Sequence, residues 1–527
     1  MLKQFVRDTL QRAGVENKVF SLFLTEENLA IFQEAFTHSS FDKKKNYEKL
    51  EHTGDTFVNL CTALYITKRF PEINNEAWLS RIKFFLQGKQ TLSKLSYENG
   101  FTDNIRMVNV EFTDEYYKDE DLMSILEDVF EAFFGAVGTV ADSTISTGAG
   151  LEICYKLLSY YFDTVRISIT VDFLFDPVTL FKEIGDAEKW NLKSPVTSFK
   201  MADGRFRAIV SAPLGVDGSS VMLGKMDSTN ITHAKNTAAR KALKALDRVY
   251  GIRSKRHDDT PTVIRPKHSF EKVQHDRFKK FMNWLLSNKG IPRKYKTYLM
   301  SKDVLENMVI NVKFCSSFVC MVGPLVLDHA ITNFADTVIG EAGEGLKTAF
   351  RHEYTKGTDI INYVNEGGFI KVAEDISPYE DQDISDKSMK LMFKGILGGI
   401  FMELWTQFSI EIAYRVAYRV CIYMFTTNKS LQPKRDSKSR LYCIFNNMKW
   451  PITQGDLIKV DYTDKIYTVT VEGYPEGTRT PAKKNRVLLA ESSGKVKADV
   501  EEEAYSKAIE KLATRYKIYS RKLFYSS

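Results

Sequence analysis

The 527-residue sequence has no run of about 18 apolar residues, the length that a membrane-spanning helix requires. Its six cysteines are scattered and form no Cys-x-x-Cys pair, which argues against a disulfide framework or a zinc site. Residues 1–10 lack the long apolar core of a secretion signal. We therefore expect an intracellular protein, most simply a cytoplasmic one, with the nucleus or an organelle left open.

A strong charge of either sign is also missing. The 74 Lys and Arg residues against 67 Asp and Glu residues give a net charge of +7, a mild basic bias that is compatible with a nucleic-acid partner without requiring one. The composition, 43% hydrophobic and 27% charged, is typical of soluble globular proteins. The length predicts roughly three to four domains.

Two predicted helices carry carboxylates on one face only. At about 100° per residue, Glu48, Glu51 and Asp55 fall within an arc of roughly 60°. In the second helix, Asp128 and Glu131 share a face in the same way. Apolar residues take the opposite faces: Leu50, Phe57, Leu60 and Leu64 in the first helix, and Phe130, Phe133, Phe134 and Val137 in the second.

Such faces are ordinarily solvated, and that reading has to be weighed against a functional one. If the two acidic faces meet, their repulsion must be relieved by protonation or by a hard divalent cation with oxygen ligands. That arrangement predicts a metal-dependent phosphodiesterase.

The surrounding residues resemble the ribonuclease III family. That family carries a Glu-x-Leu-Glu-x-x-Gly-Asp helix and a later Asp-x-x-Glu-Ala helix, which match residues 48–55 and 128–132. Two further elements match in order, Ala-Phe-Thr-His-Ser-Ser at 35–40 and Glu-Ala-Trp-Leu-Ser at 76–80. His52 and Thr53 depart from the apolar pair usual in the family, which affects local packing more than chemistry.

The resemblance implies a metal-dependent endoribonuclease that cuts double-stranded RNA. Two Mg²⁺ ions about 4 Å apart can activate water and stabilise the leaving oxygen, and Mn²⁺ is a potential substitute. By the family pattern Glu51, Asp55, Asp128 and Glu131 bind metal, and Glu48 and Glu76 are outer or second-metal acids. Glu76 can equally be a loop carboxylate. His38 is expected to be a packed, hydrogen-bonded residue of a structural helix rather than a general base.

The chain is predicted to combine all-α ribonuclease III-type domains with α+β domains of the α-β-β-β-α double-stranded-RNA-binding type. The expected order is a catalytic domain (1–165), an RNA-binding domain (170–250), a linker (251–272), a degenerate nuclease-like domain (273–430) and a degenerate RNA-binding-like domain (435–520).

The expected RNA-binding domain begins with a helix capped by Asp176 with Pro177 in its first position. Its last helix carries the candidate phosphate contacts Lys235, Arg240 and Lys241, for which the alternative is an ordinary solvated helix face. In the last domain Glu501, Glu502 and Glu503 stand where RNA would lie, which favours protein contact, with Lys483, Lys484 and Arg486 leaving a smaller chance of RNA contact.

The second half reads as a weak repeat of the first that has lost its acids. A gapless register sets Gly135 on Gly399 and therefore Asp128 on Met392 and Glu131 on Gly395. Further upstream, the best placement sets Asp55 on Asp328, Glu51 on Pro324 and Glu48 on Met321. Weaker echoes are Glu344, the acidic loop 380–383 and the segment 436–450, which parallels 176–190.

Two nuclease-type domains in one chain can pair internally, which would leave one working site and a nick in one strand. Two chains pairing through their first domains would give two sites and a double-strand cut. Because the second half keeps its apolar faces without its acids, we expect internal pairing, with the homodimer as the alternative. The competing functions are a non-catalytic double-stranded-RNA-binding or ribonucleoprotein scaffold on the same fold and a purely structural helical protein. The intact acids argue against the scaffold, and the ordered motifs against the structural protein.

Overall fold

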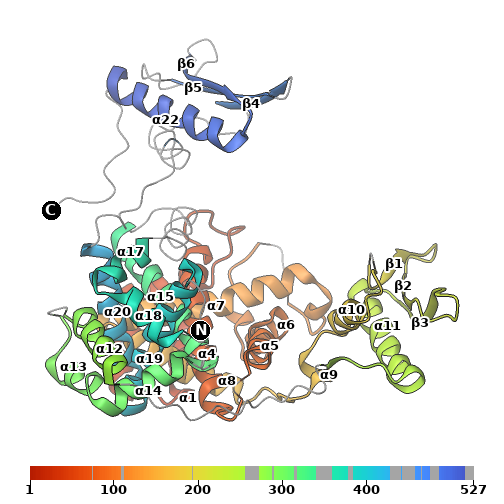
Figure 1. Cartoon of the computed structure of the whole chain (residues 1–527), viewed down its shortest axis with the longest axis horizontal. Helices are drawn as coiled ribbons and strands as arrows, with labels where there is room; N and C mark the ends of the chain where they lie inside the picture. Colours follow the sequence, from red (N-terminus) through yellow and green to blue (C-terminus); the bar gives the residue numbers. More distant parts are fainter. Residues whose placement is uncertain are drawn as a thin grey trace. The chain divides into compact units, whose positions relative to one another are not determined.

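The computed structural model describes residues 1–73, 75–108, 112–192, 194–255, 272–287, 290–313, 317–339, 359–377, 384–427, 441, 457–463, 466–474 and 486–516. The predicted echoes at Glu344, 380–383 and, apart from Leu441, 436–450 lie outside these residues, as do Lys483 and Lys484. The described part is mostly helical with two small antiparallel sheets (Figure 1). None of its helices combines the length and apolarity that crossing a membrane would take.

The chain divides into two compact units. The first comprises residues 1–329 and 367–420, and the second comprises residues 330–366 and 421–527. The first unit contains the predicted acidic helices, the first sheet and most of the second helical region.

The N-terminal helical region is built around two long helices, α4 and α7, which pack side by side. Its core is rich in phenylalanine, with Phe36, Phe101 and Phe133 in mutual ring contact. The helices are α1 (Leu2–Arg12), α2 (Asn17–Phe23), α3 (Glu26–Ala35), α4 (Glu48–Arg69), α5 (Glu76–Gln87), α6 (Lys89–Glu98), α7 (Glu120–Thr144) and α8 (Ala149–Phe162), with short 3₁₀ turns η1 (Thr102–Asn104) and η2 (Tyr116–Lys118).

Two glycines set the approach of α4 to α7. A Cβ on Gly54 would collide with the backbone carbonyl of Glu131, and a Cβ on Gly135 would collide with the carbonyl of Leu50. Because only glycine leaves room for this backbone-to-backbone contact, the pair fixes the register of the two helices.

The C-terminal helical region repeats this contact between α15 and α19. Its helices are α12 (Lys272–Leu285), α13 (Arg293–Leu299), α14 (Lys302–Lys313), α15 (Ser317–Ile339), α18 (Phe369–Ile376), α19 (Asp386–Gln407) and α20 (Ile410–Thr427). A Cβ on Gly323 would collide with the carbonyl of Lys394, and one on Gly398 with the carbonyl of Val319. Gly323 thus matches Gly54, and Gly398 matches Gly135.

This contact corrects the register expected from sequence. Glu131 corresponds to Lys394 and Asp128 to Leu391, one residue away from the predicted Gly395 and Met392. On α15, Asp55 corresponds to Pro324, four residues from the predicted Asp328, and Glu51 corresponds to Cys320. Asp328 corresponds to Asn59 and His329 to Leu60. The prediction failed because α19 offers three nearby glycines, and sequence alone does not tell which one meets the facing helix.

The first sheet packs against α11 (Figure 1). The antiparallel order is β1-β2-β3, with Thr197 opposite Ile209 and with a bulge between Val210 and Ser211. As predicted, Asp176 caps the preceding helix by accepting from the Thr179 amide at 2.8 Å. The elements are α9 (Val171–Leu174), α10 (Pro177–Ala187), β1 (Thr197–Lys200), β2 (Phe206–Ala212), β3 (Val221–Ser228), α11 (Ile231–Ala245) and the π-helical turn η3 (Leu246–Tyr250).

The second unit contains a similar sheet. Its order β4-β5-β6 is antiparallel, its middle strand has a bulge between Val471 and Glu472, and α22 packs on β5 and β6. Arg486, a predicted minor RNA contact, donates to the Tyr474 hydroxyl at 2.9 Å and pairs with Glu472 at 3.4 Å. The elements are α17 (Asp359–Glu366), β4 (Ile458–Thr463), β5 (Ile466–Gly473), β6 (Val487–Gly494) and α22 (Lys497–Tyr516).

Within the first unit, α4 contacts α15 through His329. The fully buried His329 ring shares a 2.7 Å hydrogen bond between its Nδ1 and the Thr56 hydroxyl, and its centroid lies 4.3 Å from that of Phe57. Burial lowers the pKa of His329 from 6.5 to about 3. A neutral imidazole therefore joins the two helical regions.

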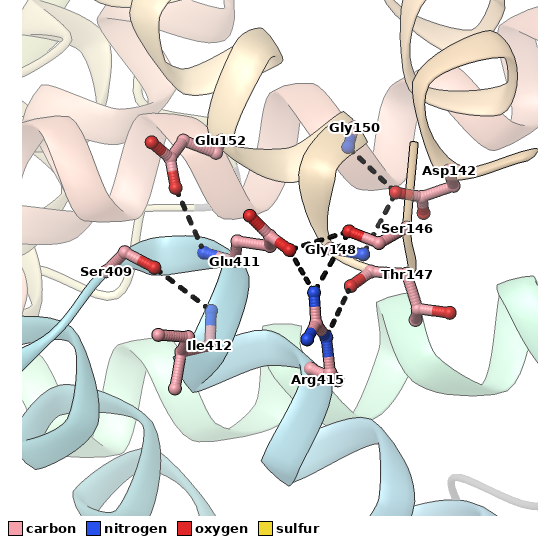
Figure 2. Close-up of polar contacts among 10 residues, drawn as sticks. All are labelled: Asp142, Ser146, Thr147, Gly148, Gly150, Glu152, Ser409, Glu411, Ile412 and Arg415. Carbon is pink, nitrogen blue, oxygen red and sulfur yellow. Dashed lines mark hydrogen bonds and ion pairs between the residues drawn. The ribbon is translucent and has the colours of Figure 1, made fainter. Parts of the chain in front are cut away.

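A second polar contact joins the loop before α8 to the start of α20 (Figure 2). Ser146 donates to Glu411 at 2.6 Å and accepts from Arg415 at 2.9 Å, while Arg415 also pairs with Glu411 and reaches the Thr147 carbonyl at 3.4 Å. The Glu411 amide donates to Glu152 at 3.3 Å. The two helical regions are therefore joined by polar contacts (Figure 2) as well as by the buried His329.

The loop geometry at this junction depends on Gly148. This residue has φ +94°, and a Cβ on it would lie 2.7 Å from the Glu411 carbonyl oxygen. Asp142 holds the loop by accepting from the amides of Gly148 at 2.9 Å and Gly150 at 2.7 Å. The close approach of α20 therefore requires glycine at this position.

Candidate active site

The first acidic helix, α4, begins at Glu48 directly after Tyr47, which is its N-cap. Glu48 is exposed, whereas Glu51 and Asp55 are half-buried on the side that faces α7. Leu50, Phe57, Leu60 and Leu64 are buried, as the helical spacing predicts. The apolar face thus anchors the helix, and the acidic face stays available for chemistry.

The second acidic helix, α7, brings three half-buried carboxylates beside α4: Glu127, Asp128 and Glu131. Burial, and after it the charges of neighbouring carboxylates, together raise the pKa of Glu131 to about 9. In decreasing order of effect, these neighbours are Asp55, Glu127, Glu51 and Asp128. Carboxylates from both helices therefore act on one group. The structure brings together the four residues predicted from sequence to bind metal.

Glu127 joins Glu51, Asp55, Asp128 and Glu131 as a fifth carboxylate, and we call these five residues the acidic cluster. Glu127 was not predicted from the sequence. Burial raises its pKa, and the charges of Asp128 and Asp55 add to the shift while Lys89 opposes it. Glu127 directly precedes Asp128, but the motif carries no residue requirement at that position, so the sequence offered no signal for it.

Polar neighbours hold the individual acids in place. The Tyr47 hydroxyl donates to Asp128 at 3.3 Å, and Asn59 donates to Asp55 at 2.5 Å. The Asn59 side-chain carbonyl accepts in turn from the Lys83 ammonium at 2.8 Å. Asn59 lies four residues after Asp55 on the same helix face and could have been found by spacing, whereas Lys83 comes from α5 and could not.

Lys83 lies between the acidic cluster and the C-terminal helical region. Burial lowers the pKa of its ammonium, and the carboxylates of Asp55 and Asp328 oppose that shift. Asp328 likewise opposes the lowering of the Lys394 pKa, which burial causes and Lys390 adds to. The charge of Asp328 therefore acts on a lysine of each helical region, Lys83 and Lys394.

Other predicted site residues are arranged differently. Glu76 is exposed at the first position of α5 and is not among the charges that act on Glu131. His38 lies in the turn after α3 rather than in a helix, hydrogen-bonded to Ser40 at 2.8 Å, and its charge acts on Asp128. The structural-helix prediction for His38 was wrong because α3 ends at Ala35, where the chain turns to pair with Arg106.

The predicted RNA contacts on α11 do not form one cluster. Lys241 is exposed and donates to the Lys225 carbonyl at 3.1 Å, and Lys235 is half-buried. Arg240 lines a pocket of about 390 Å³ between α10 and α11, together with Lys244 and Asp247.

The cluster on α4 and α7 fits a hard divalent cation by its chemistry. Its donors are all carboxylate oxygens. Burial, together with the crowding of these carboxylates, raises the pKa of Glu131, a cost that a bound cation would offset. In the described residues, no three His, Cys, Asp or Glu side chains are close enough together to hold a metal ion as they stand. Binding a cation would therefore require these side chains to move closer together.

Comparison with known proteins places this cluster in a family. A family profile described as "Ribonuclease-III-like" matches residues 28–142, which include both acidic helices. The ribonuclease 3 of Aliarcobacter butzleri (strain RM4018) is 33% identical over 161 residues, covering 31% of this chain and 67% of that protein. The chain belongs to the ribonuclease III family.

Two viral members of the ribonuclease III family are also similar. The "Putative ribonuclease 3" of Frog virus 3 (isolate Goorha) is 34% identical over 33% of this chain, which spans about half (47%) of that protein. The protein of the same name from Invertebrate iridescent virus 6 is 27% identical over 53% of this chain and 92% of that protein.

Two solved structures are similar as well. The nuclease domain of ribonuclease III from Campylobacter jejuni matches 29% of this chain and 99% of its own, with a TM-score of 0.23 and 25% identity. The match to the Dicer of Pichia stipitis covers 41% of this chain and 92% of that structure's chain, with a TM-score of 0.19 and 22% identity.

Proposed function

We propose that the chain is a divalent-metal-dependent endoribonuclease that hydrolyses phosphodiester bonds of double-stranded RNA at the α4–α7 cluster. The observation that carries the proposal is the convergence of carboxylates from both helices on Glu131. Crowded, half-buried acids are costly for the fold and are common at functional sites. Membership of a family of endoribonucleases supports the same reaction.

The residues of the cluster take distinct roles in this proposal. Glu51, Asp55, Asp128 and Glu131 would hold Mg²⁺, which when bound would polarise the scissile phosphate and activate water. Tyr47 fixes Asp128, and Asn59 fixes Asp55 while it is itself held by Lys83. Glu127 adds negative charge beside these ligands, and Glu48 and Glu76 stay as exposed outer acids. Mn²⁺ would substitute for Mg²⁺.

Cleavage of a long duplex RNA with Mg²⁺ tests the proposal, with both strands end-labelled. Glu131→Gln is expected to abolish cleavage with little effect on folding, because the change is nearly isosteric. Glu120→Gln, an exposed acid at the start of the same helix, is the matched control and should cleave normally. Full activity in Glu131→Gln, or cleavage that survives thorough chelation, would contradict the proposal. Binding without cleavage by the unaltered chain would favour the scaffold function instead.

We further propose that the two helical regions of the first unit pair within one chain. The buried Thr56–His329 hydrogen bond supports this, because Leu60 corresponds to His329. A homodimer of N-terminal regions would set a leucine against Thr56, and a homodimer of C-terminal regions would leave His329 without this partner, at a cost of about 1–3 kcal/mol. Internal pairing leaves one acidic cluster and predicts a nick in one strand.

Light scattering and strand-specific end mapping test the pairing. The expected species is a monomer that cuts one labelled strand per encounter. A stable dimer that makes paired cuts with a short 3′ overhang would show that N-terminal regions of two chains pair with each other.

We also propose that residues 170–250 bind duplex RNA by shape, as the α-β-β-β-α order and the bulged sheet support. Lys235 and Lys241 would contact phosphate, and Arg240 would contribute from the edge of its pocket. Replacing all three by Gln should weaken binding to duplex RNA and leave the single-turnover rate at saturation unchanged. For α22 in the second unit we propose a protein contact, because Glu502 and Glu503 are exposed on this helix and their charge would oppose RNA phosphate.

A further inference from the structure

The face of α19 that corresponds to the acidic face of α7 is basic. The glycine contacts match Glu131 with Lys394, Glu127 with Lys390 and Asp128 with Leu391. On α15, the positions of Asp55 and Glu51 are taken by Pro324 and Cys320. Five carboxylates of one cluster are thus replaced by two ammonium groups and three uncharged residues.

A third lysine extends this face. Lys387, Lys390 and Lys394 have helical spacing of three and four residues, so they lie on one side of α19. Lys387 is exposed and Lys390 and Lys394 are half-buried, so the row runs from the surface inward. We call these three residues the lysine row.

A series of charged side chains links the lysine row to the acidic cluster. Lys83 lies within electrostatic reach of both Asp55 and Asp328, and Asp328 lies within reach of Lys394. A ligand that lies across the acidic cluster therefore extends naturally toward the lysine row.

We propose that the lysine row binds phosphate groups of duplex RNA directly, on the strand that the acidic cluster does not cut. This rests on the proposed function, in which the ligand of that surface is a duplex with phosphates on both strands. At the acidic cluster a divalent cation must stand between carboxylates and phosphate, whereas at the lysine row the cation is part of the side chain. A lysine ammonium is a compact point charge suited to this contact.

The binding test uses the full chain with Glu131→Gln, which prevents cleavage, and measures the affinity for duplex RNA at several salt concentrations. Replacing Lys387 and Lys390 by Gln is expected to weaken binding several-fold and to reduce the slope of log affinity against log salt by about one per lysine. Arginine at both positions should restore the slope. The matched control, Lys279→Gln with Lys371→Gln, removes two exposed lysines of the same helical region and should change neither quantity.

Adding Lys394→Gln should weaken RNA binding and reduce the salt slope further. Because Lys394 is half-buried, thermal melting of this variant is needed to detect any loss of folding. The proposal is overturned if the unaltered chain cleaves the duplex while the Lys387/Lys390 variant keeps both affinity and salt slope. If the unaltered chain neither binds nor cleaves duplex RNA, the proposed function itself fails, and that result is seen before any lysine is changed.

A further experiment tests which RNA strand the lysine row contacts. Single phosphates are replaced, one at a time along each strand, by neutral methylphosphonates. Substitution at one or two positions of the uncut strand should weaken binding by the chain with the lysine row intact and have no effect once the row is replaced by Gln. Interference that depends on the lysine row but falls on the cut strand would overturn the proposal.

Discussion

The helix pairs α4–α7 and α15–α19 approach each other through the same two glycine contacts and carry opposite charges beside them. In both pairs the backbone of one helix meets the backbone of the other at Gly54 and Gly135, or at Gly323 and Gly398. The neighbouring face holds Glu131 in one pair and Lys394 in the other. The register of a helix pair and the charge beside it can therefore differ independently. The register depends on glycines, which have no side chain, whereas the charge depends on the residues of the neighbouring face.

The largest expected effect comes from copying the lysine into the acidic cluster. Glu131→Lys removes a proposed metal ligand and adds a cation where Mg²⁺ would lie. Cleavage should fall by well over a hundredfold, since changes even in outer-shell partners of metal sites cost about 10–100-fold. Lys394→Gln, the matched change in the other pair, should lower RNA affinity and keep the single-turnover rate at saturating RNA. Equal losses of rate in both variants would remove the distinction between the two sites.

The next effect concerns the shared backbone contact. Gly54→Ala and Gly323→Ala each force a Cβ into a facing carbonyl, and we expect each to cost about 3 kcal/mol of unfolding free energy or more. Gly395→Ala is the control on α19, where the new Cβ would lie 3.4 Å from Val312 and gain helix propensity. Denaturant unfolding measures all three. A Gly323→Ala protein as stable as the Gly395→Ala protein would mean that the two helix pairs do not share this contact.

A smaller effect is expected at Asn59, whose counterpart is Asp328. Asn59→Leu removes the donor to Asp55 without adding a charge, so the Asp55 carboxylate is no longer held in position and metal binding weakens. The Mg²⁺ concentration for half-maximal cleavage should rise about 10–100-fold, with the rate at saturating Mg²⁺ less affected. An unchanged Mg²⁺ requirement would show that Asn59 does not position Asp55.

The smallest effect, when counted per pH unit, is a change in pH dependence at His329, whose counterpart is Leu60. The folded-state pKa of His329 is about 3 against 6.5 for the unfolded chain, so its contribution to stability is full above pH 6.5 and is lost as pH falls toward 3. Between pH 6.5 and about 3, each unit by which the pH falls should therefore lower the unfolding free energy by about 1.4 kcal/mol more in the unaltered chain than in His329→Leu. Parallel pH profiles would contradict a buried neutral imidazole.

The sequence was sufficient for the parts of the site that follow from helical spacing. The two acidic faces, their buried opposite faces and the capped start of α10 are all local consequences of residue order. Lys83 and His329 could not be foreseen, because each reaches the site through the packing of a distant helix. Glu127 escaped for a different reason, since nothing distinguishes it from a solvated acid until α4 and α7 are side by side.

The hydrogen bond between Thr56 and His329 has a consequence for the synthesis of the chain. The two residues are separated by 273 positions, so at roughly 5–20 residues per second the second follows the first off the ribosome by about 14–55 s. During that interval α4 is complete while the helix that covers Thr56 and Phe57 does not yet exist. Two nascent chains on one message would have time to meet through this surface. Slower translation ahead of residue 329 should therefore increase the yield of chains paired with each other rather than with themselves.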